Sequence, residues 1–571
     1  MKSISRRQFL KVAGLGTAGV ASALALAACS NSSGNGGSTS SGAATTQEVT
    51  DKAQEAFKDD AAEVIQIDES RKTTASTGER YPRITFANGT NPNQLDPLAA
   101  RLSGCFNIYI YEFLVDQLGT DESDWVPRLA KEWGYVDDTH YQFKLYDNIY
   151  DWEGNKFTAN DVKFVYEKYL ESGLANADYK MVDHVEVIDD YTVQYVFKAP
   201  LSTLSALYTL VWLNMFTQAA YESHDFSTDP VGTGPYKLSK FEVGTRVVVE
   251  ANDDYWQSDD LASPRAKRNV QEIELAVVSE YAMQLVTFEQ GNNMMLEIDA
   301  DDVKSFLPGG KYDGQYNLVQ RKEGSNFRLL YNLSGQTITR DENLRRAIAL
   351  CIDSDAIAYA MGDGIYFECK VNACPTLPDY QPEWENYESE MNEYNLDKAK
   401  EYLAKSEYNG ENLIIMASAS GKHKKMAELV KTFLDVLGVN SELAFYENAV
   451  IDTYRNDPSY WSLYADINDS KVSVIDLWIK KFGTTYGGLQ GYAYCFVQDD
   501  KLNDMLYTAY NPETYSVDLV NEINDYMMDN AYVRPLVYSV VYQAFQPQIA
   551  EVVYARDKTW VQFNSCEYYL D

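Results

Sequence analysis

The side chains in this sequence that could carry out acid–base or metal chemistry are few and widely spaced. The chain has four histidines, at His140, His184, His224 and His423. It contains no His-Glu-x-x-His, Gly-x-Ser-x-Gly or Gly-x-x-x-x-Gly-Lys motif, so the patterns typical of zinc proteases, serine hydrolases and phosphate-binding loops are missing. These absences argue against an enzyme, and we expect no cofactor and no metal site.

One cysteine near the N-terminus has a setting that predicts a covalent modification. Cys29 ends the run 26–29 (LAAC), which resembles a bacterial lipobox, where small residues let a peptidase cut before a cysteine that becomes lipidated. Two acyl chains would anchor the protein stably, because each buried methylene contributes about 0.8 kcal/mol and one chain alone is marginal. We predict lipidation at Cys29.

The other six cysteines, at positions 105, 351, 369, 374, 495 and 566, would lie in an exported protein, where disulfides are permitted. Six cysteines allow 15 pairings, so the sequence alone leaves the connectivity open. Cys369 and Cys374 are close in the chain, in a segment that ends in Pro375, and they are the candidate disulfide. A zinc site would need more ligands than this spacing offers.

The first 28 residues predict an export signal that is removed. Residues 5–11 (SRRQFLK) resemble a twin-arginine signal, which directs folded proteins to their translocase. The uncharged run 12–28 is shorter than the roughly 20 residues of a membrane-spanning helix. Residues 30–46 are almost entirely small and polar, which is typical of a flexible coil, and 47–80 has few large apolar residues. We therefore assign 29–80 to a flexible tether.

The remaining body of roughly 490 residues is too long for a single core. Its composition is globular, with 45% hydrophobic residues, but the net charge is −36 and becomes −40 once the four basic residues of the signal are removed. Such an acidic chain makes nucleic acid an improbable partner and favours solubility outside the cell. No apolar stretch of the mature chain is long enough to span a membrane.

Helical and extended patterns alternate along the body, which predicts an α/β fold. Helix patterns begin at a capping box over 158–161 and near Asp341, and a third ends at Gly438. Strand patterns lie at 191–197, 246–250, 273–278 and 327–332.

A set of motifs then identifies a family. Residues 229–236 (DPVGTGPY) form a glycine-rich turn, followed by a hairpin pattern and by NDDYW at 252–256. This combination resembles the peptide- and nickel-binding family of extracytoplasmic solute-binding proteins of ABC importers. Further blocks follow the order of that family, at 95–97, 111–115, 126–133, 141–145, 152–162, 345–348 and 352–353. Two departures are a shortened Trp-x-Asp-Gly motif at 152–154 and a loose match at 294–299.

The resemblance implies a two-lobed periplasmic-binding-protein fold with a hinge and an additional subdomain inserted in the first lobe. The expected boundaries are 81–119, 215–328 and 533–571 for lobe I, 120–214 for the inserted subdomain and 329–532 for lobe II.

The resemblance also implies where a ligand binds. Peptide-binding members hold the ligand's amino group with an aspartate and pair its backbone with an extended segment from each lobe. Residues 463–469 (LYADIND) are similar to the family's Trp-x-Ala-Asp-Tyr-x-x-Pro, which assigns Asp466 to the amine; the alternative is an aspartate that caps a turn. The other expected contacts are Leu463, Tyr464, Ala465 and Trp461 in lobe II, Arg101, Leu102 and Ser103 in lobe I, and Tyr538 near the C-terminal crossover.

The predicted function is that of a monomeric, lipid-anchored protein on the outer face of the cytoplasmic membrane, or on the periplasmic side where an outer membrane exists. It would deliver ligand, peptides first among the candidates, to the permease subunits of an ABC importer. The alternatives are the same fold with a nickel chelate or an oligosaccharide as ligand, or a surface sensor or adhesin. Twin-arginine export would allow loading before export, so it leaves a bound cofactor open.

Overall fold

The computed structural model describes residues 68–570 with short gaps. The gaps are 89–91, 100–105, 118–124, 173, 175–178, 202, 211–212, 259–265, 378, 448–449, 469–472, 485–494, 512 and 556–559. The predicted signal peptide, Cys29, most of the predicted tether and the segment Arg101, Leu102 and Ser103 lie outside the described residues. Within these described ranges, no helix is both long and apolar enough to cross a membrane.

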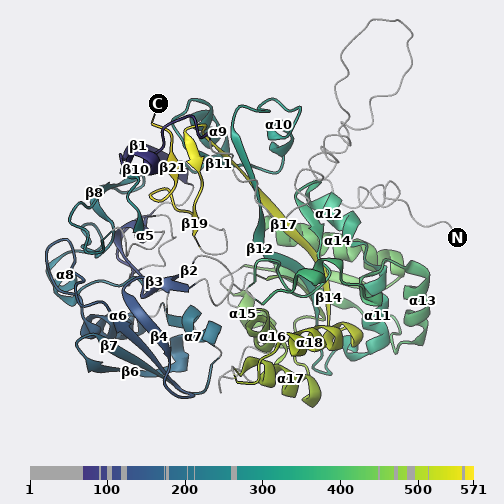
Figure 1. Cartoon of the computed structure of the whole chain (residues 1–571). Coiled ribbons are helices and arrows are strands. Elements are labelled where there is room, and N and C mark those ends of the chain that lie inside the picture. The colour runs from purple at the N-terminus through teal and green to yellow at the C-terminus, as the bar shows by residue number, and fades with distance from the viewer. Residues whose placement is uncertain are drawn as a thin grey trace, which may run out of the picture.

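Two halves of the molecule are joined by two long antiparallel strands, β12 (Asn317–Tyr331) and β17 (Val533–Phe545). Figure 1 shows both strands crossing from the half that holds the C-terminus to the half built from the middle of the chain. We call the former lobe I and the latter lobe II. This arrangement confirms the predicted α/β fold of two lobes joined by a hinge.

Lobe I contains a four-stranded sheet with the order β1-β10-β9-β8. Strand β1 runs parallel to β10, and the other neighbours are antiparallel. The inward side chains alternate along the strands, as period-2 patterning requires, and bury Ile84, Phe86, Val247, Val249, Ile273 and Leu275. The four strands are β1 (Tyr81–Asn88), β8 (Tyr236–Glu242), β9 (Arg246–Ala251) and β10 (Val270–Val277).

A second, antiparallel sheet with the order β4-β5-β7-β6 forms a separate unit beside the first. We call residues 130–197 the β4–β7 unit; it lies within the predicted inserted subdomain, 120–214. Helix α6 (Ala159–Glu171) belongs to this unit and begins at the predicted capping box, where Asp161 Oδ2 accepts a hydrogen bond from Thr158 N at 2.7 Å. The strands are β4 (Ala130–Tyr135), β5 (His140–Leu145), β6 (Val182–Asp189) and β7 (Thr192–Phe197).

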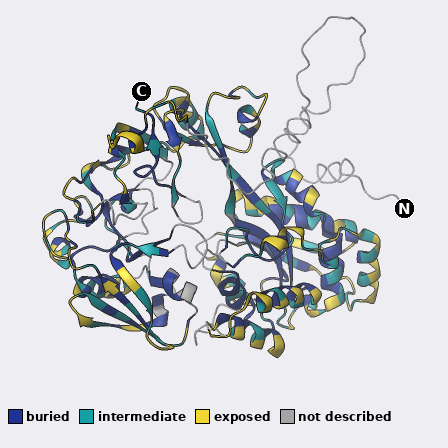
Figure 2. Ribbon diagram, viewed as in Figure 1, coloured by how far each residue is buried: buried dark blue, intermediate teal, exposed yellow. Residues whose placement is uncertain are grey.

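The sheet of lobe II has the order β11-β17-β12-β16-β14-β15, with β13 also paired to β17. Strands β12 and β17 are buried along most of their length in lobe II (Figure 2). The strands that join them are β11 (Met295–Glu297), β13 (Tyr366–Glu368), β14 (Leu413–Ser418), β15 (Ser441–Tyr446) and β16 (Leu463–Asn468).

The helices of lobe II include the two that the sequence predicted. Helix α11 (Glu342–Cys351) is capped by Asp341, whose Oδ1 accepts from Leu344 N at 3.1 Å. Helix α14 (Gly421–Leu437) ends at Gly438 with a φ of 88°, a left-handed conformation that glycine adopts without strain. The others are α12 (Ser354–Gly362), α13 (Leu396–Lys405), α15 (Ile451–Arg455), α16 (Val474–Phe482), α17 (Asp500–Tyr510) and α18 (Val517–Asp529).

Shorter elements complete lobe I and its edges. They are α4 (Thr74–Thr77), α5 (Asn107–Ile110), β2 (Val115–Gln117), β3 (Trp125–Pro127), α7 (Thr203–Leu210), α8 (Gln218–Ser223), α9 (Tyr281–Glu289), α10 (Val303–Phe306), β18 (Ile549–Glu551), β19 (Tyr554–Ala555), β20 (Trp560–Val561) and β21 (Glu567–Tyr568).

The crossing strands are irregular where they pass between the lobes. The pairing of β12 with β17 shifts register between Lys322 and Asn326. Before this irregularity β12 pairs with residues 540–545; after it, β12 lies between β17 and β16. The predicted boundary between lobes at 328/329 therefore falls inside a strand, and both lobes share β12 and β17.

The last part of the predicted tether is not a flexible coil. Residues 68–80 pack on the C-terminal segment: Asp68 N donates to Tyr569 Oη at 2.7 Å, the Arg71 guanidinium lies 3.7 Å from the centre of that ring, and Leu570 N donates to Lys72 O at 3.0 Å. The prediction of a tether over 29–80 is wrong for these residues. The polar sequence gave no sign of the backbone pairing that holds them.

Candidate ligand-binding site

The predicted ligand residue Asp466 lies inside a central strand of lobe II and forms a buried ion pair. In the register of β16 with β12 it is directly opposite Arg328. The Nε and Nη2 atoms of Arg328 donate to Asp466 Oδ2 at 3.1 and 2.7 Å. The Arg328 side chain is fully buried and that of Asp466 is 7% exposed. Two donors on one carboxylate oxygen form a strong, charge-assisted contact.

Neighbouring segments hold this ion pair from the side. Arg328 Nη1 donates to Asn372 Oδ1 at 3.1 Å, and Trp478 Nε1 donates to the Asn372 carbonyl at 2.8 Å. The loop 369–374 and helix α16 therefore cover the face of the sheet on which Arg328 and Asp466 meet. Arg328 is fixed by its contacts before any ligand binds.

The electrostatics of the site keep Asp466 charged. Burial acts to raise the pKa of Asp466, but the positive charges of Arg328 and Lys481 and the hydrogen bonds from Arg328 outweigh it, so the pKa lies below its ordinary value. Tyr464 shares this environment, and burial together with the Asp466 charge raises the pKa of its hydroxyl. Cations of the protein itself, Arg328 first among them, account for a buried, ionised Asp466, so its contact with a ligand amine stays a prediction.

Two other predicted residues of β16, Leu463 and Ala465, have side chains on the opposite face of the sheet from Asp466. Leu463 and Ala465 are fully buried and lie opposite Tyr331 and Leu329 in the register, so their side chains point away from the face that carries Asp466. Only their backbone is positioned to take part in a site on that face.

Trp461 also belongs to the core of lobe II. Its Nε1 donates to the Arg455 carbonyl at 3.0 Å, and its ring lies 6.1 Å from that of Tyr464. Of the residues predicted around Asp466, the structure therefore brings only Tyr464 into the same polar environment.

The backbone pairing of β16 changes along the strand. All six residues pair with β12, whereas the pairing with β14 covers only Leu463 and Tyr464. Among the described strands, the second half of β16 (residues 465–468) therefore has a neighbour on one side. A strand with one such edge is suited to pair with an extended ligand.

Tyr538 on β17 is aligned across the sheet with Asn468, the last residue of β16. It is opposite Asn326, which is in turn opposite Asn468. Its ring stacks on Phe367 of β13, with ring centres 5.7 Å apart, and it is half-buried beside the irregularity in β12. The structure thus places Tyr538 at the passage between the lobes.

A family model for bacterial extracellular solute-binding proteins, described as "family 5 Middle", matches residues 124–496, more than half of the chain. The chain belongs to this family. The nickel-binding protein NikA of Staphylococcus aureus is 27% identical over 416 residues, which cover 69% of this chain and 73% of NikA. The dipeptide-binding protein of Escherichia coli is 21% identical over 378 residues, which cover 60% of this chain and 67% of that protein. These relatives are named as binding proteins rather than enzymes.

Solved structures of low identity share the fold of this family 5 protein. HbpA2 from Haemophilus parasuis has a TM-score of 0.72 at 19% identity, covering 86% of this chain and all of that one. NikA from Brucella suis in complex with Fe(III)-EDTA has a TM-score of 0.68 at 19% identity, covering 85% and 99%. The predicted family and fold are therefore confirmed.

The candidate disulfide of this family 5 protein is not formed in the structure. Among the described residues, neither Cys369 nor Cys374 takes part in a disulfide bond. Cys369 Sγ donates to the Val371 carbonyl at 3.1 Å, and Cys374 Sγ donates to the Glu323 carbonyl at 3.1 Å. The prediction of a loop staple was based on closeness in sequence, and the structure gives each thiol a backbone acceptor instead.

Sequence reasoning missed four residues of the site: Arg328, Asn372, Trp478 and Lys481. A signal for one of them was present, since Arg328 interrupts the otherwise apolar run at 327–331, and a charge in a buried strand requires a partner. Within the part of the chain that the structure describes, no three His, Cys, Asp or Glu side chains come together as metal ligands.

Proposed function

We propose that this protein captures peptides in the cleft between its lobes and delivers them to the permease subunits of an ABC importer. The observation that carries the peptide assignment is the pairing of β16, whose residues 465–468 are paired with β12 and have no described strand on the β14 side. An extended peptide would add there as a strand, with its own backbone groups satisfying that edge. Backbone pairing also suits a receptor of broad sequence specificity.

Charges of both signs lie close to that edge. Asp466 is influenced by the positive charges of Arg328, Lys481 and Arg455. A zwitterionic peptide has an ammonium and a carboxylate to place among these groups, whereas a neutral oligosaccharide has neither. In this proposal the amine approaches Asp466 beside Arg328 and does not displace it, since Arg328 is held by Asn372.

Capture would proceed by closure of the lobes about the crossing strands. The register shift after Lys322 interrupts the pairing of β12 and β17 where they pass between the lobes. A break in a ladder is a position at which backbone angles can change without loss of regular hydrogen bonds. Tyr538 and Arg101, Leu102 and Ser103 are proposed as contacts from the hinge and from the facing lobe.

The proposal includes a lipid anchor at Cys29 after removal of residues 1–28, with the protein acting as a monomer outside the cytoplasm. Because residues 68–80 pack on the body, the tether of this proposal shortens to residues 29–67. At full extension such a segment spans at most about 140 Å. That reach lets a body held on the membrane surface present either lobe to a permease.

Native mass spectrometry of the purified mature protein tests the proposal, because closed binding proteins often retain their ligands. A ladder of co-purified peptide masses, followed by calorimetric binding of the same peptides to protein stripped of ligand, is the expected result. A retained sugar, or no binding of any peptide in a mixed library, would overturn the assignment.

A nickel chelate is the second candidate ligand, because one of the two relatives described above is a nickel-binding protein at 27% identity. The same preparations should be titrated with nickel in the presence of free histidine. Saturable binding of the nickel–histidine mixture, together with failure to bind peptides, would favour this candidate.

A further inference from the structure

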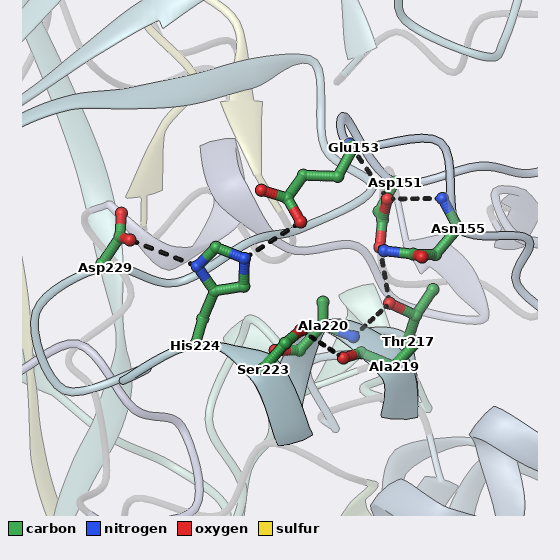
Figure 3. A network of polar contacts seen from close by, with 9 residues as sticks. All are labelled: Asp151, Glu153, Asn155, Thr217, Ala219, Ala220, Ser223, His224 and Asp229. Atoms are coloured by element: carbon green, nitrogen blue, oxygen red, sulfur yellow. Dashed lines mark hydrogen bonds and ion pairs between the residues drawn. The ribbon is translucent and has the colours of Figure 1, made fainter.

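His224 lies between two carboxylates that come from different parts of the chain (Figure 3). Its Nε2 is 2.9 Å from Glu153 Oε2, and its Nδ1 is 3.2 Å from Asp229 Oδ2. Glu153 belongs to the β4–β7 unit, in the turn that leads into α6, whereas Asp229 follows α8 in lobe I. A neutral imidazole has one donor nitrogen, so only the protonated ring donates to both carboxylates. The geometry therefore favours an imidazolium that bridges the two parts.

The turn that carries Glu153 is fixed by its own hydrogen bonds. Asp151 Oδ1 accepts from the backbone N–H groups of Glu153 at 3.0 Å and Asn155 at 2.9 Å. Asp151 Oδ2 accepts from Thr217 Oγ1, the residue that caps the start of α8, at 2.5 Å. His224 stands at the other end of the same helix, so α8 is attached to the β4–β7 unit at both of its ends (Figure 3).

This joint is continuous with the wall of lobe I. Trp152 N donates to the Gly232 carbonyl at 3.3 Å, and Gly234 N donates to the Ile110 carbonyl at 3.0 Å. A Cβ on Gly232 would lie 2.0 Å from that Ile110 oxygen, so the glycine-rich turn is pressed directly against α5. A displacement of the turn at 151–155 would therefore displace the backbone of α5 through the contacts of Gly232 and Gly234.

We propose that His224 is a pH-dependent clamp that holds the β4–β7 unit against lobe I while its ring is protonated. Loss of the proton removes one of the two hydrogen bonds and the attraction to both carboxylates. The bonds of Asp151 remain, so the joint loosens at the C-terminal end of α8 and stays attached at the N-terminal end. The clamp concerns the attachment of this unit and is independent of which ligand the protein carries.

The acidic surroundings of His224 support this clamp. Hydrogen bonds to Asp229 and Glu153 raise the pKa of His224 above its ordinary value. Other nearby carboxylates have partners of their own: Asp151 with Asn155 and Thr217, Glu222 with Gln218, and Asp225 with Ser227 and Thr228. Because the folded pKa is raised, the contribution of His224 is complete below about pH 6.5 and is lost as the pH rises through the raised value.

Hydrogen exchange read by mass spectrometry tests the clamp in the mature protein. The probe is the backbone protection of peptides covering 147–157 and 225–236 at pH 6 and pH 8, after correction for the intrinsic exchange rate. The expected result is exchange about two- to five-fold faster at pH 8, the range for a partly exposed ion pair, and loss of this difference in His224→Gln. His184→Gln is the matched control, because His184 also contacts two carboxylates but both belong to its own strand, β6.

Proton NMR supplies an independent readout, since the chain has only four histidines to assign. The ring of His224 is expected to titrate above the ordinary histidine range, and Glu153→Gln, a change of a partly exposed side chain, is expected to lower its pKa without unfolding the protein. Equal protection at both pH values in the unmodified protein, the same loss in His184→Gln as in His224→Gln, or an unmoved titration in Glu153→Gln would each overturn the clamp.

Discussion

Arg328 on β12 and Asp466 on β16 lie directly opposite each other and form an ion pair buried in the sheet of lobe II. Asp466 lies inside β16, so the alternative prediction of an aspartate that caps a turn is wrong, and a contact with a ligand amine would have to coexist with this ion pair. A carboxylate that already has a cation partner is stable in the folded protein without a ligand, and a ligand amine would have to share it. The roles of the two residues can be tested separately, because removing Arg328 takes the hydrogen-bonding cation from Asp466, whereas removing Asp466 takes the carboxylate from Arg328 and from any ligand amine.

Arg328→Met should destabilise the protein strongly. The substitution keeps an extended apolar side chain in the strand but leaves Asp466 charged, buried and without its bidentate partner. Breaking a buried pair in this way costs about 3–5 kcal/mol in the free energy of unfolding. Urea denaturation followed by circular dichroism measures the loss. In the double variant Arg328→Met/Asp466→Leu most of it should return, and a double variant as unstable as the single one would contradict the assignment.

Asp466→Ala should weaken peptide binding by a few kcal/mol if the carboxylate holds the ligand amine, because the ammonium would lose a charged partner in a desolvated site. Calorimetry at fixed pH measures the change. Arg455→Gln serves as a comparison, since it removes a neighbouring charge and leaves the carboxylate in place. An affinity unchanged in a folded Asp466→Ala protein would limit Asp466 to its structural pairing with Arg328.

Asp379 should make lobe II less stable as the pH rises. Most acidic residues have the opposite effect, because their pKa is lowered in the folded protein. Its carboxylate accepts hydrogen bonds from Val474 N at 2.5 Å and Ile475 N at 3.2 Å at the start of α16, yet burial raises its pKa to about 6. Because the folded pKa lies above the unfolded value, the stabilising contribution is present below about pH 4 and is lost as the pH rises through 6.

Asp379→Asn removes this titration. Between pH 4.5 and 7.5 the free energy of unfolding of the unmodified protein should fall relative to that of the variant by about 2 kcal/mol, most of the equivalent of the raised pKa. Urea denaturation at several pH values gives both curves. Parallel curves for the two proteins would show that Asp379 does not titrate in this range.

The sequence predicted those features of the fold and of the site that depend on residues close together in the chain. The caps at Asp341 and Gly438 and the capping box over 158–161 were predictable, because each rests on residues within one turn of its helix. The Arg328–Asp466 pair joins residues 138 apart, and only the register of two strands brings them together. The docking of residues 68–80 depends on the far end of the chain in the same way, which is why a polar composition was misread as a flexible tether.

Gly232→Ala should disrupt the glycine-rich turn that first identified the family. A Cβ at this position would lie 2.0 Å from the Ile110 carbonyl oxygen, a backbone atom that cannot move without displacing α5. Overpacking against fixed backbone costs about 1–3 kcal/mol, and more where the neighbour cannot relax. Gly421→Ala is the matched control, since a Cβ there meets nothing within 4 Å. Thermal unfolding should show a lowered midpoint for Gly232→Ala alone, and equal midpoints would mean that the contact between this turn and α5 is looser than the structure indicates.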